Sequence, residues 1–189
     1  MKNNSKNPAE VKSINTRSEI YEWIQSIIIA IILCVIVFVF FVRVVDVVGP
    51  SMNPTLEDGD KMIVSNLFYE PKAGDIVIFR KDEYKPEALV KRVIATEGQT
   101  VEIDFNKGIV YVDGVALDEP YTAAPTINQL DFKGAQVVPE GCVFVLGDNR
   151  NDSTDSRKTE IGMVDTRMII GKVHFVIFPI DRIGNPYGD

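Results

Sequence analysis

The sequence has few of the residues from which several common kinds of functional site are built. It contains one histidine, His174, and two cysteines, Cys34 and Cys142. One histidine excludes a multi-histidine metal site, and two cysteines are too few for a four-ligand zinc site or a disulfide framework. Basic residues are also outnumbered, because 20 lysines and arginines stand against 27 acidic residues, for a net charge of -7. This balance argues against a nucleic-acid-binding protein, which usually carries a basic patch.

One long apolar run stands out against this acidic background. Residues 24–42 are 19 consecutive residues without a charge, and as a helix they would extend about 28 Å, close to the hydrocarbon thickness of a bilayer. A buried core helix is disfavoured because the rest of the chain is too small to cover it on every side. A cleaved secretory signal is disfavoured because the run is long and no Ala-x-Ala follows it. The sequence therefore predicts an uncleaved transmembrane signal-anchor at 24–42.

The flanks of this run predict its orientation. The short segment 1–23 carries four basic residues, whereas Arg43 is the only basic residue directly after the run. Positive charge is enriched on the cytoplasmic side of membrane spans. We therefore expect a cytoplasmic tail at 1–23 and an extracytoplasmic domain at 43–189, in a single-pass protein of the cytoplasmic membrane.

The chain after residue 42 consists of short β-rich runs separated by turn signals. Asn106-Lys107-Gly108 and Asp113-Gly114 are typical of hairpin loops. No amphipathic helix of about 10–15 residues alternates with the runs, so a parallel doubly wound sheet is not expected. The sequence predicts a mainly β fold of antiparallel sheets, with a smaller and partly irregular inserted region at about 96–141. The strand-like runs are 62–65, 76–79, 89–95, 100–103, 109–112, 143–147 and 168–178.

The first segment whose residues could take part in catalysis is 49–56, Gly-Pro-Ser-Met-Asn-Pro-Thr-Leu. Ser51 follows the apolar run by nine residues, so it can lie no more than about 30 Å from the membrane surface. Gly49 and Pro50 favour a rigid, exposed turn around this serine. An ordinary turn without a catalytic role could have the same sequence. The segment is not the nucleophile turn of an α/β-hydrolase, because Asn53 breaks the Gly-x-Ser-x-Gly pattern.

The second segment, 89–94, places two cations in a β-branched run. Neighbouring residues of a strand point to opposite faces, so Lys91 and Arg92 cannot both lie on the solvated face of a one-sided sheet. A flat edge strand with both charges in water is the alternative. Burial disfavours the charged form of lysine, and a pKa lowered from about 10.4 toward about 8 would give a competent general base.

The third segment, 147–157, follows a predicted strand and alternates acidic, amide and hydroxyl side chains. A calcium loop of the EF-hand type is excluded in detail, because its third, sixth and twelfth positions would be Arg150, Ser153 and Thr159. A solvated polar loop is the remaining structural alternative. Against it, the segment is unusually rich in groups that orient their neighbours through hydrogen bonds and ion pairs.

These three segments, in this order and after a single N-terminal span, resemble the bacterial type I signal peptidases of the single-span, Gram-positive-like group. The resemblance extends from the span to about residue 184. It implies that Ser51 is the nucleophile, that Lys91 is the general base, and that Ser153 orients the lysine amine. It also implies that Asp155 and Arg157 form a structural pair, with Asp148 and Arg150 in supporting roles.

Two further sets of residues follow from the resemblance. Some members carry a serine two residues before the nucleophile, whose hydroxyl helps to stabilise the oxyanion, but this chain has Gly49. The Ser51 N–H is then the expected oxyanion donor, with the Gly49 backbone as the candidate second donor. Candidate residues for the substrate pocket are Val47, Met52, Leu56 and Val90.

The function implied is that of a membrane-anchored serine endopeptidase that removes signal peptides from exported preproteins after small residues of the Ala-x-Ala type. The peptide would add as an extended strand to a sheet edge. The expected partners are secretory preproteins and the lipid bilayer, without nucleic acid, metal or organic cofactor. His174 is expected to be a packed strand residue. Two alternatives remain: a Ser-Lys autoprotease of the repressor-cleavage type, and a non-catalytic, membrane-tethered β domain that binds peptides or cell-wall components.

Overall fold

The computed structural model describes residues 8–81 and 84–188, which form two compact units, Met1–Phe41 and Val42–Asp189. The described part of the first unit is one helix, α1 (Pro8–Phe41). Within it, Ser18–Ile36 is long and apolar enough to cross a membrane, and none of it is buried against protein. The predicted span 24–42 lies in α1 except for Val42, which is the first residue of strand β1.

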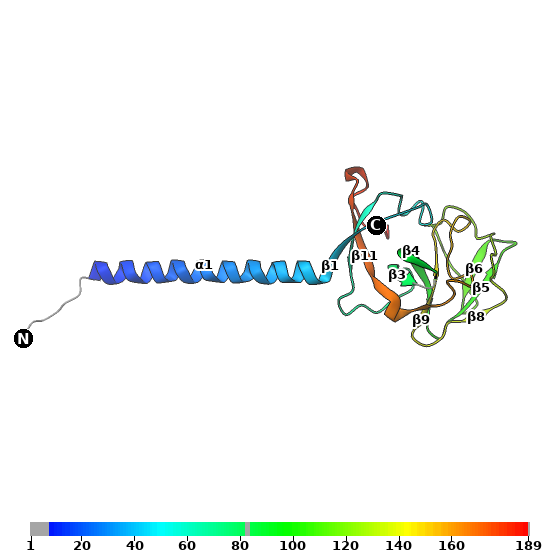
Figure 1. The fold of residues 1–189 in the computed structure, drawn as a ribbon, viewed down its shortest axis with the longest axis horizontal. Helices are drawn as coiled ribbons and strands as arrows, with labels where there is room; N and C mark the ends of the chain where they lie inside the picture. The colour runs from blue at the N-terminus through cyan, green and yellow to red at the C-terminus, as the bar shows by residue number, and fades with distance from the viewer. Residues whose placement is uncertain (1–7, 82–83, 189) are drawn as a thin grey trace, which may run out of the picture. The chain divides into compact units, whose positions relative to one another are not determined.

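The second unit contains two antiparallel sheets (Figure 1). The strands of the seven-stranded sheet, in spatial order, are β1 (Val42–Asp46), β2 (Lys61–Ser65), β11 (Ile169–Phe178), β3 (Ile76–Lys81), β4 (Lys85–Thr96), β9 (Cys142–Leu146) and β10 (Val164–Asp165). Those of the four-stranded sheet are β7 (Val115–Ala116), β6 (Ile109–Val112), β5 (Thr100–Asp104) and β8 (Gln136–Val137). Two short 3-10 helices, η1 (Thr166–Met168) and η2 (Ile180–Arg182), flank β11. The predicted mainly β, antiparallel fold is confirmed.

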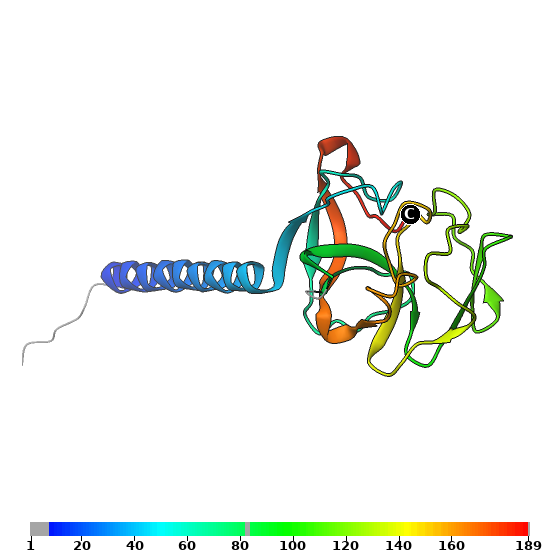
Figure 2. The ribbon, with the colours of Figure 1, turned by 45° about the vertical axis from the view of Figure 1, so that its right-hand side comes forward.

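The four-stranded sheet is inserted between two neighbouring strands of the larger one. β4 and β9 pair with each other, with Arg92 opposite Leu146, although residues 97–141 separate them in the chain. Figures 1 and 2 both show β5, β6 and β8 at the end of this unit away from β1. Sequence patterning predicts the insertion, but it misses β7 and β8 because two-residue strands carry no periodic signal.

The core explains why the central strands are almost continuously apolar. β3 lies between β11 and β4, and its residues Ile76–Phe79 are fully buried, as expected for a strand that is covered on both faces. A second apolar cluster joins the two sheets, where Phe132 packs edge-to-face on Phe144 with ring centroids 5.7 Å apart. The central strand β4 is thereby held on both sides, and its side chains keep fixed positions.

Candidate active site

Ser51 lies on the turn between β1 and β2. Two backbone hydrogen bonds tighten this turn, from Asn53 to Pro50 and from Leu56 to Met52, each 3.0 Å long. Met52 and Leu56 are buried and fix the turn to the core, while Ser51 itself is only half-buried. Ser51 is therefore partly exposed on a firmly anchored backbone.

Lys91 reaches this serine from the middle of β4. Its Nζ donates hydrogen bonds to Ser51 Oγ at 2.7 Å and to the Val90 carbonyl at 2.8 Å. Lys91 is only 2% exposed, and the loss of hydration lowers its pKa from 10.5 to about 8. The negative charges of Asp155 and Asp148 act in the opposite direction, because they stabilise the protonated amine and raise the pKa of Lys91. In its neutral form, this amine is within reach of the hydroxyl proton of Ser51.

Arg92, the next residue of β4, is also buried, at 3% exposure. Its guanidinium makes a two-pronged ion pair with Asp148, at 2.8 and 2.7 Å, and donates to the Gly74 carbonyl at 2.9 Å. The Tyr121 ring covers the guanidinium, with 3.9 Å between its centroid and the guanidinium carbon. The edge-strand alternative is therefore wrong, because β4 is an interior strand between β3 and β9 and both cations are buried.

The loop 147–157 is bound to the nucleophile turn. Asp148 accepts a 2.5 Å hydrogen bond from the Thr55 hydroxyl, in addition to its pair with Arg92. Asn149 donates its backbone N–H to the Ser51 carbonyl at 3.1 Å and its side-chain amide to the Pro50 carbonyl at 3.2 Å. The third segment of the sequence is thus not a solvated loop, since it holds the serine-bearing backbone directly.

Two buried ion pairs give this loop its shape. Arg157 pairs with Asp155 at 2.9 and 2.8 Å, and Asp155 also accepts the Gly147 N–H at 3.1 Å. Arg150 makes a two-pronged pair with Glu119 at 2.8 and 2.6 Å. A buried charge is tolerated only when it is paired and hydrogen-bonded, so each of these residues depends on its partner.

Ser153 lies close to the nucleophile turn, without a hydrogen bond to Lys91. Its buried Oγ has no hydrogen-bond partner within residues 8–81 and 84–188. A Cβ added at Gly147 would lie 2.2 Å from this Oγ and 2.5 Å from the Ser51 carbonyl oxygen, so the three backbones are tightly packed. Orientation of the Lys91 amine by Ser153 therefore stays a prediction.

The Gly49 N–H, the candidate second oxyanion donor, already makes a hydrogen bond within the protein, and its role as a donor stays a prediction. It donates to the Asp58 carboxylate at 2.7 Å. Gly49 adopts φ +89°, a conformation that an L side chain would find strained. The Asp58 contact stabilises this backbone, and a side-chain to backbone bond across nine residues has no sequence signature.

The four candidate pocket residues belong to a single apolar cluster. Val47, Met52 and Leu56 are buried, and Val90 packs against them while remaining partly exposed. They lie in the neighbourhood of Ser51 and Lys91 by their positions on the turn and on β4. Which of them contact a substrate stays a prediction.

Other groups that sequence reasoning singled out or missed lie either next to this centre or away from it. Glu119 and Tyr121 come from the irregular insertion and cover Arg150 and Arg92, although nothing in their spacing indicates this contact. His174 lies half-buried on β11, with Nε2 2.8 Å from Ser65 Oγ, and has no hydrogen bond to Ser51 or Lys91. Among the residues that the structure describes, no group of three or more His, Cys, Asp or Glu side chains could hold a metal ion.

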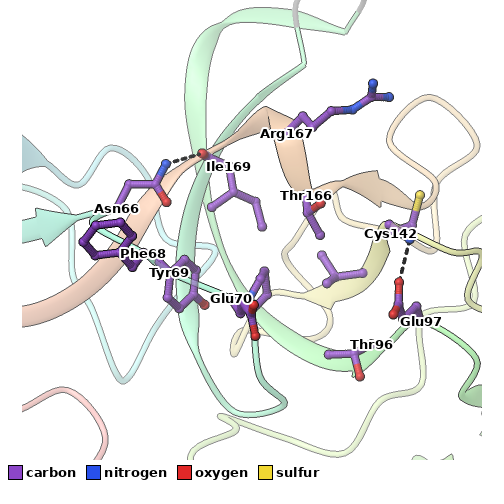
Figure 3. Close-up of a pocket in the computed structure, with 13 residues that line it drawn as sticks. Asn66, Phe68, Tyr69, Glu70, Thr96, Glu97, Cys142, Thr166, Arg167 and Ile169 are labelled. Atoms are coloured by element: carbon purple, nitrogen blue, oxygen red, sulfur yellow. Dashed lines mark hydrogen bonds between the residues drawn. The ribbon is translucent and has the colours of Figure 1, made fainter.

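Figure 3 shows a separate cavity of about 770 Å³, lined on one side by Phe68 and Tyr69 and on the other by Cys142 and Arg167. Neither Ser51 nor Lys91 lines it. This cavity is therefore separate from the two groups of the candidate site.

Comparison with known proteins identifies relatives over most of the chain. Residues 20–178 match the family model described as "Signal peptidase, peptidase S26". Signal peptidase I of Bacillus licheniformis is 38% identical over 184 residues, covering 92% of this chain and 97% of the relative. Probable signal peptidase I-1 of Synechocystis is 39% identical over 175 residues, covering 87% and 86%. A crystal structure of a signal peptidase I from Enterococcus faecalis is 30% identical, covers 55% of this chain and 97% of that one, and has a TM-score of 0.46.

Proposed function

Since the chain belongs to the signal peptidase I family of serine endopeptidases, peptidase S26, we propose that it cleaves signal peptides with a Ser-Lys dyad formed by Ser51 and Lys91. The observation that carries this proposal is the 2.7 Å contact between Lys91 Nζ and Ser51 Oγ, made by a buried amine whose pKa is lowered to about 8. A neutral amine can replace the histidine of the more common triad.

The reaction follows from the positions of these two groups. Neutral Lys91 takes the proton of Ser51 Oγ while the oxygen bonds to the carbonyl carbon of the substrate. The resulting ammonium then gives this proton to the leaving amine nitrogen as the C–N bond breaks, which leaves an ester on Ser51. Water attacks the ester, with its proton going to Lys91, and the released serine regains a proton from the ammonium.

The oxyanion formed in each step needs hydrogen-bond donors that are already in place. We assign the first of them to the backbone N–H of Ser51. Asn149 supports this role, because its two hydrogen bonds hold the Pro50 and Ser51 carbonyls and thereby fix the orientation of the peptide unit between them. Asp58 supports it from the other side by binding the Gly49 N–H.

For specificity, we propose that the substrate binds as an extended strand and that its small residues, in the Ala-x-Ala pattern, fill shallow pockets. Val47, Met52, Leu56 and Val90 form the candidate walls of these pockets. Since the first three are buried in a filled core, the remaining space suits alanine better than a large side chain.

We also propose that α1 anchors the enzyme in the cytoplasmic membrane, with residues 1–23 inside and residues 43–189 outside. The apolar stretch of the helix and the basic residues before it support this orientation. Protease added to intact spheroplasts should digest the chain after residue 42 and spare residues 1–23. Protection of the β-rich unit would contradict the orientation.

The dyad is tested by incubating the detergent-solubilised protein with a preprotein and sequencing the N-terminus of the product. Ser51→Ala and Lys91→Ala should each abolish cleavage with an unchanged circular dichroism spectrum. Ser65→Ala and Lys158→Ala are the matched controls and should remain active. Retention of more than a few per cent of activity in Ser51→Ala would disprove the serine mechanism, and a protein that tolerates both dyad changes would be a binding domain.

A further inference from the structure

The C-terminal segment 179–188 folds back along β11 and reaches the turn that carries Ser51. After η2 the chain returns beside β11, where Val176 and Gly184 exchange two backbone hydrogen bonds of 2.9 and 3.1 Å. In Figures 1 and 2 this red end of the chain lies beside the cyan segment between β1 and β2. The two segments are in contact although 122 residues separate Asp60 from Arg182 in the sequence.

Arg182 makes the contacts between this segment and the turn. Its Nε donates to Asp60 Oδ1 at 3.0 Å and its Nη2 donates to Oδ2 at 3.1 Å, which is the two-pronged geometry that suits a guanidinium and a carboxylate. Its Nη1 donates to Glu57 at 2.6 Å, and its Nη2 also donates to the Thr55 carbonyl at 3.3 Å. One side chain thus binds three residues of the turn.

Asp60 closes the turn at its base. Its carbonyl accepts the Val47 N–H at 2.8 Å, and its carboxylate accepts the Glu57 N–H at 2.9 Å. The side chain is only 1% exposed, and a buried carboxylate is tolerated only when it is paired. Because its partner is Arg182, the closed form of the turn depends on a residue of the C-terminal segment.

Thr55 connects the same turn to the strand that carries the general base. Its hydroxyl donates to Asp148, which pairs with Arg92, the neighbour of Lys91 on β4. Its carbonyl accepts the hydrogen bond from Arg182. The turn is therefore held at this residue by two separate segments, and these contacts set the distance between the nucleophile and the base.

From this network we propose that Arg182 is a positioning residue for the cleavage reaction. It acts through the carbonyl of Thr55 and the carboxylate of Asp60, and it holds the nucleophile at the correct distance from the base. This inference rests on the proposed dyad, and it adds that the site is complete only when the C-terminal segment has folded onto the turn. A chain that ended before residue 182 would carry both dyad residues without the geometry for cleavage.

The test compares Arg182→Gln with a control change in the same segment. Glutamine cannot reproduce the two-pronged pair, and it leaves the Asp60 carboxylate without its cation. Tyr187→Phe is the matched control, because the Tyr187 hydroxyl binds the Val173 carbonyl at 2.6 Å and the Ile76 N–H at 3.1 Å, both of which lie outside the turn. Both changes loosen the C-terminal segment, but only the first releases the nucleophile turn.

Each full-length protein is assayed in detergent with a cleavage-site peptide, under conditions where urea denaturation shows that it is fully folded. Arg182→Gln should lower kcat by about 10–100-fold, because a displacement of about 1 Å at the reacting groups can cost about 100-fold. KM should change little, since Met52 and Leu56 of the candidate pocket stay buried in the core. Tyr187→Phe should keep the wild-type kcat.

Arg182→Lys gives an intermediate case and serves in place of Arg182→Gln if that variant does not fold. Lysine keeps the charge beside Asp60 but lacks the planar fork. We expect its kcat to lie between those of Arg182→Gln and the wild type. A wild-type kcat in Arg182→Lys would contradict the proposal, because an ammonium group cannot hold Thr55 and Asp60 together in the same way.

The remaining outcomes separate this inference from the proposed function. If Ser51→Ala is inactive while Arg182→Gln keeps the wild-type kcat, the positioning role is disproved and the dyad stands. If Ser51→Ala is active, the dyad fails and this inference fails with it. An equal loss of kcat in Arg182→Gln and Tyr187→Phe would assign the effect to the whole segment and contradict a specific role of Arg182. A raised KM with unchanged kcat would place Arg182 in substrate binding, which also contradicts the proposal.

Discussion

The pH dependence of cleavage can be predicted from the surroundings of Lys91. Burial lowers its pKa from 10.5 to about 8, even though Asp155 and Asp148 partly stabilise the charge. At pH 7 roughly one amine in ten is then neutral, against about one in three thousand for a lysine with the ordinary value. We expect kcat/KM to rise about tenfold per pH unit below pH 8 and to level off above it, because only the neutral amine can accept the Ser51 proton.

The assay is a kcat/KM profile from about pH 6 to 10, measured in detergent with a peptide derived from a signal-peptide cleavage site. Lys91→Arg should be inactive across this range, because guanidinium does not lose its proton in proteins. An acidic limb near about 6.5 that disappears in His174→Gln would refute the lysine base. An acidic limb near the ordinary lysine pKa of about 10.4 would show that the Lys91 amine is hydrated and its pKa is not lowered.

The same pKa shift favours catalysis but lowers the stability of the folded protein. The folded-state pKa, about 8, lies below the value of 10.5 that the unfolded chain retains. Between these two values the unfolded chain binds more protons, so stability rises with pH, and below pH 8 the destabilisation is complete. Lys91→Met should therefore increase the free energy of unfolding at pH 7 by up to about 3 kcal/mol, measured by urea denaturation. The gain should vanish above pH 10.5; a gain that is constant with pH would contradict this origin.

Three further changes probe the support of the site. Gly147→Ala should abolish cleavage, because the new Cβ would lie 2.5 Å from the carbonyl oxygen of the nucleophile, whereas Gly184→Ala, with open space around it, should be active in the same assay. Arg157→Met leaves Asp155 buried without its partner and should lower the free energy of unfolding by about 3–5 kcal/mol in urea. Asp58→Ala removes the acceptor of an N–H two residues before the nucleophile. It should lower kcat, while Asp58→Asn restores much of the rate; equal rates would rule out the positioning role.

Much of the fold could be predicted because its central strands follow simple physical rules. The runs 76–79 and 143–147 are apolar and contain β-branched residues because they lie in interior strands of a covered sheet, and turn residues mark their ends. The alternation of a strand also indicates that Lys91 and Arg92 point to opposite faces. It does not indicate that both faces are covered, since that depends on the neighbours β3 and β9.

The contacts that the sequence does not reveal are those between distant segments. Tyr121 and Glu119 lie in an irregular region, and their partners Arg92 and Arg150 are tens of residues away. No periodicity or spacing rule connects a tyrosine in a loop to a guanidinium on a strand. Strand β1 is missed for another reason, because its apolar residues continue the run of the preceding helix.

The insertion between β4 and β9 gives the fold a place where its length can change at little cost. Because the two strands are neighbours, residues 97–141 leave the larger sheet and return to the adjacent position. Lengthening such a connection costs only about 0.6 kcal/mol per doubling in loop-closure entropy. The exposed turn at Asp113-Gly114 is thus a natural point for inserting a reporter or an affinity tag. The segment 119–126, which contacts the two arginines, would have to be kept intact.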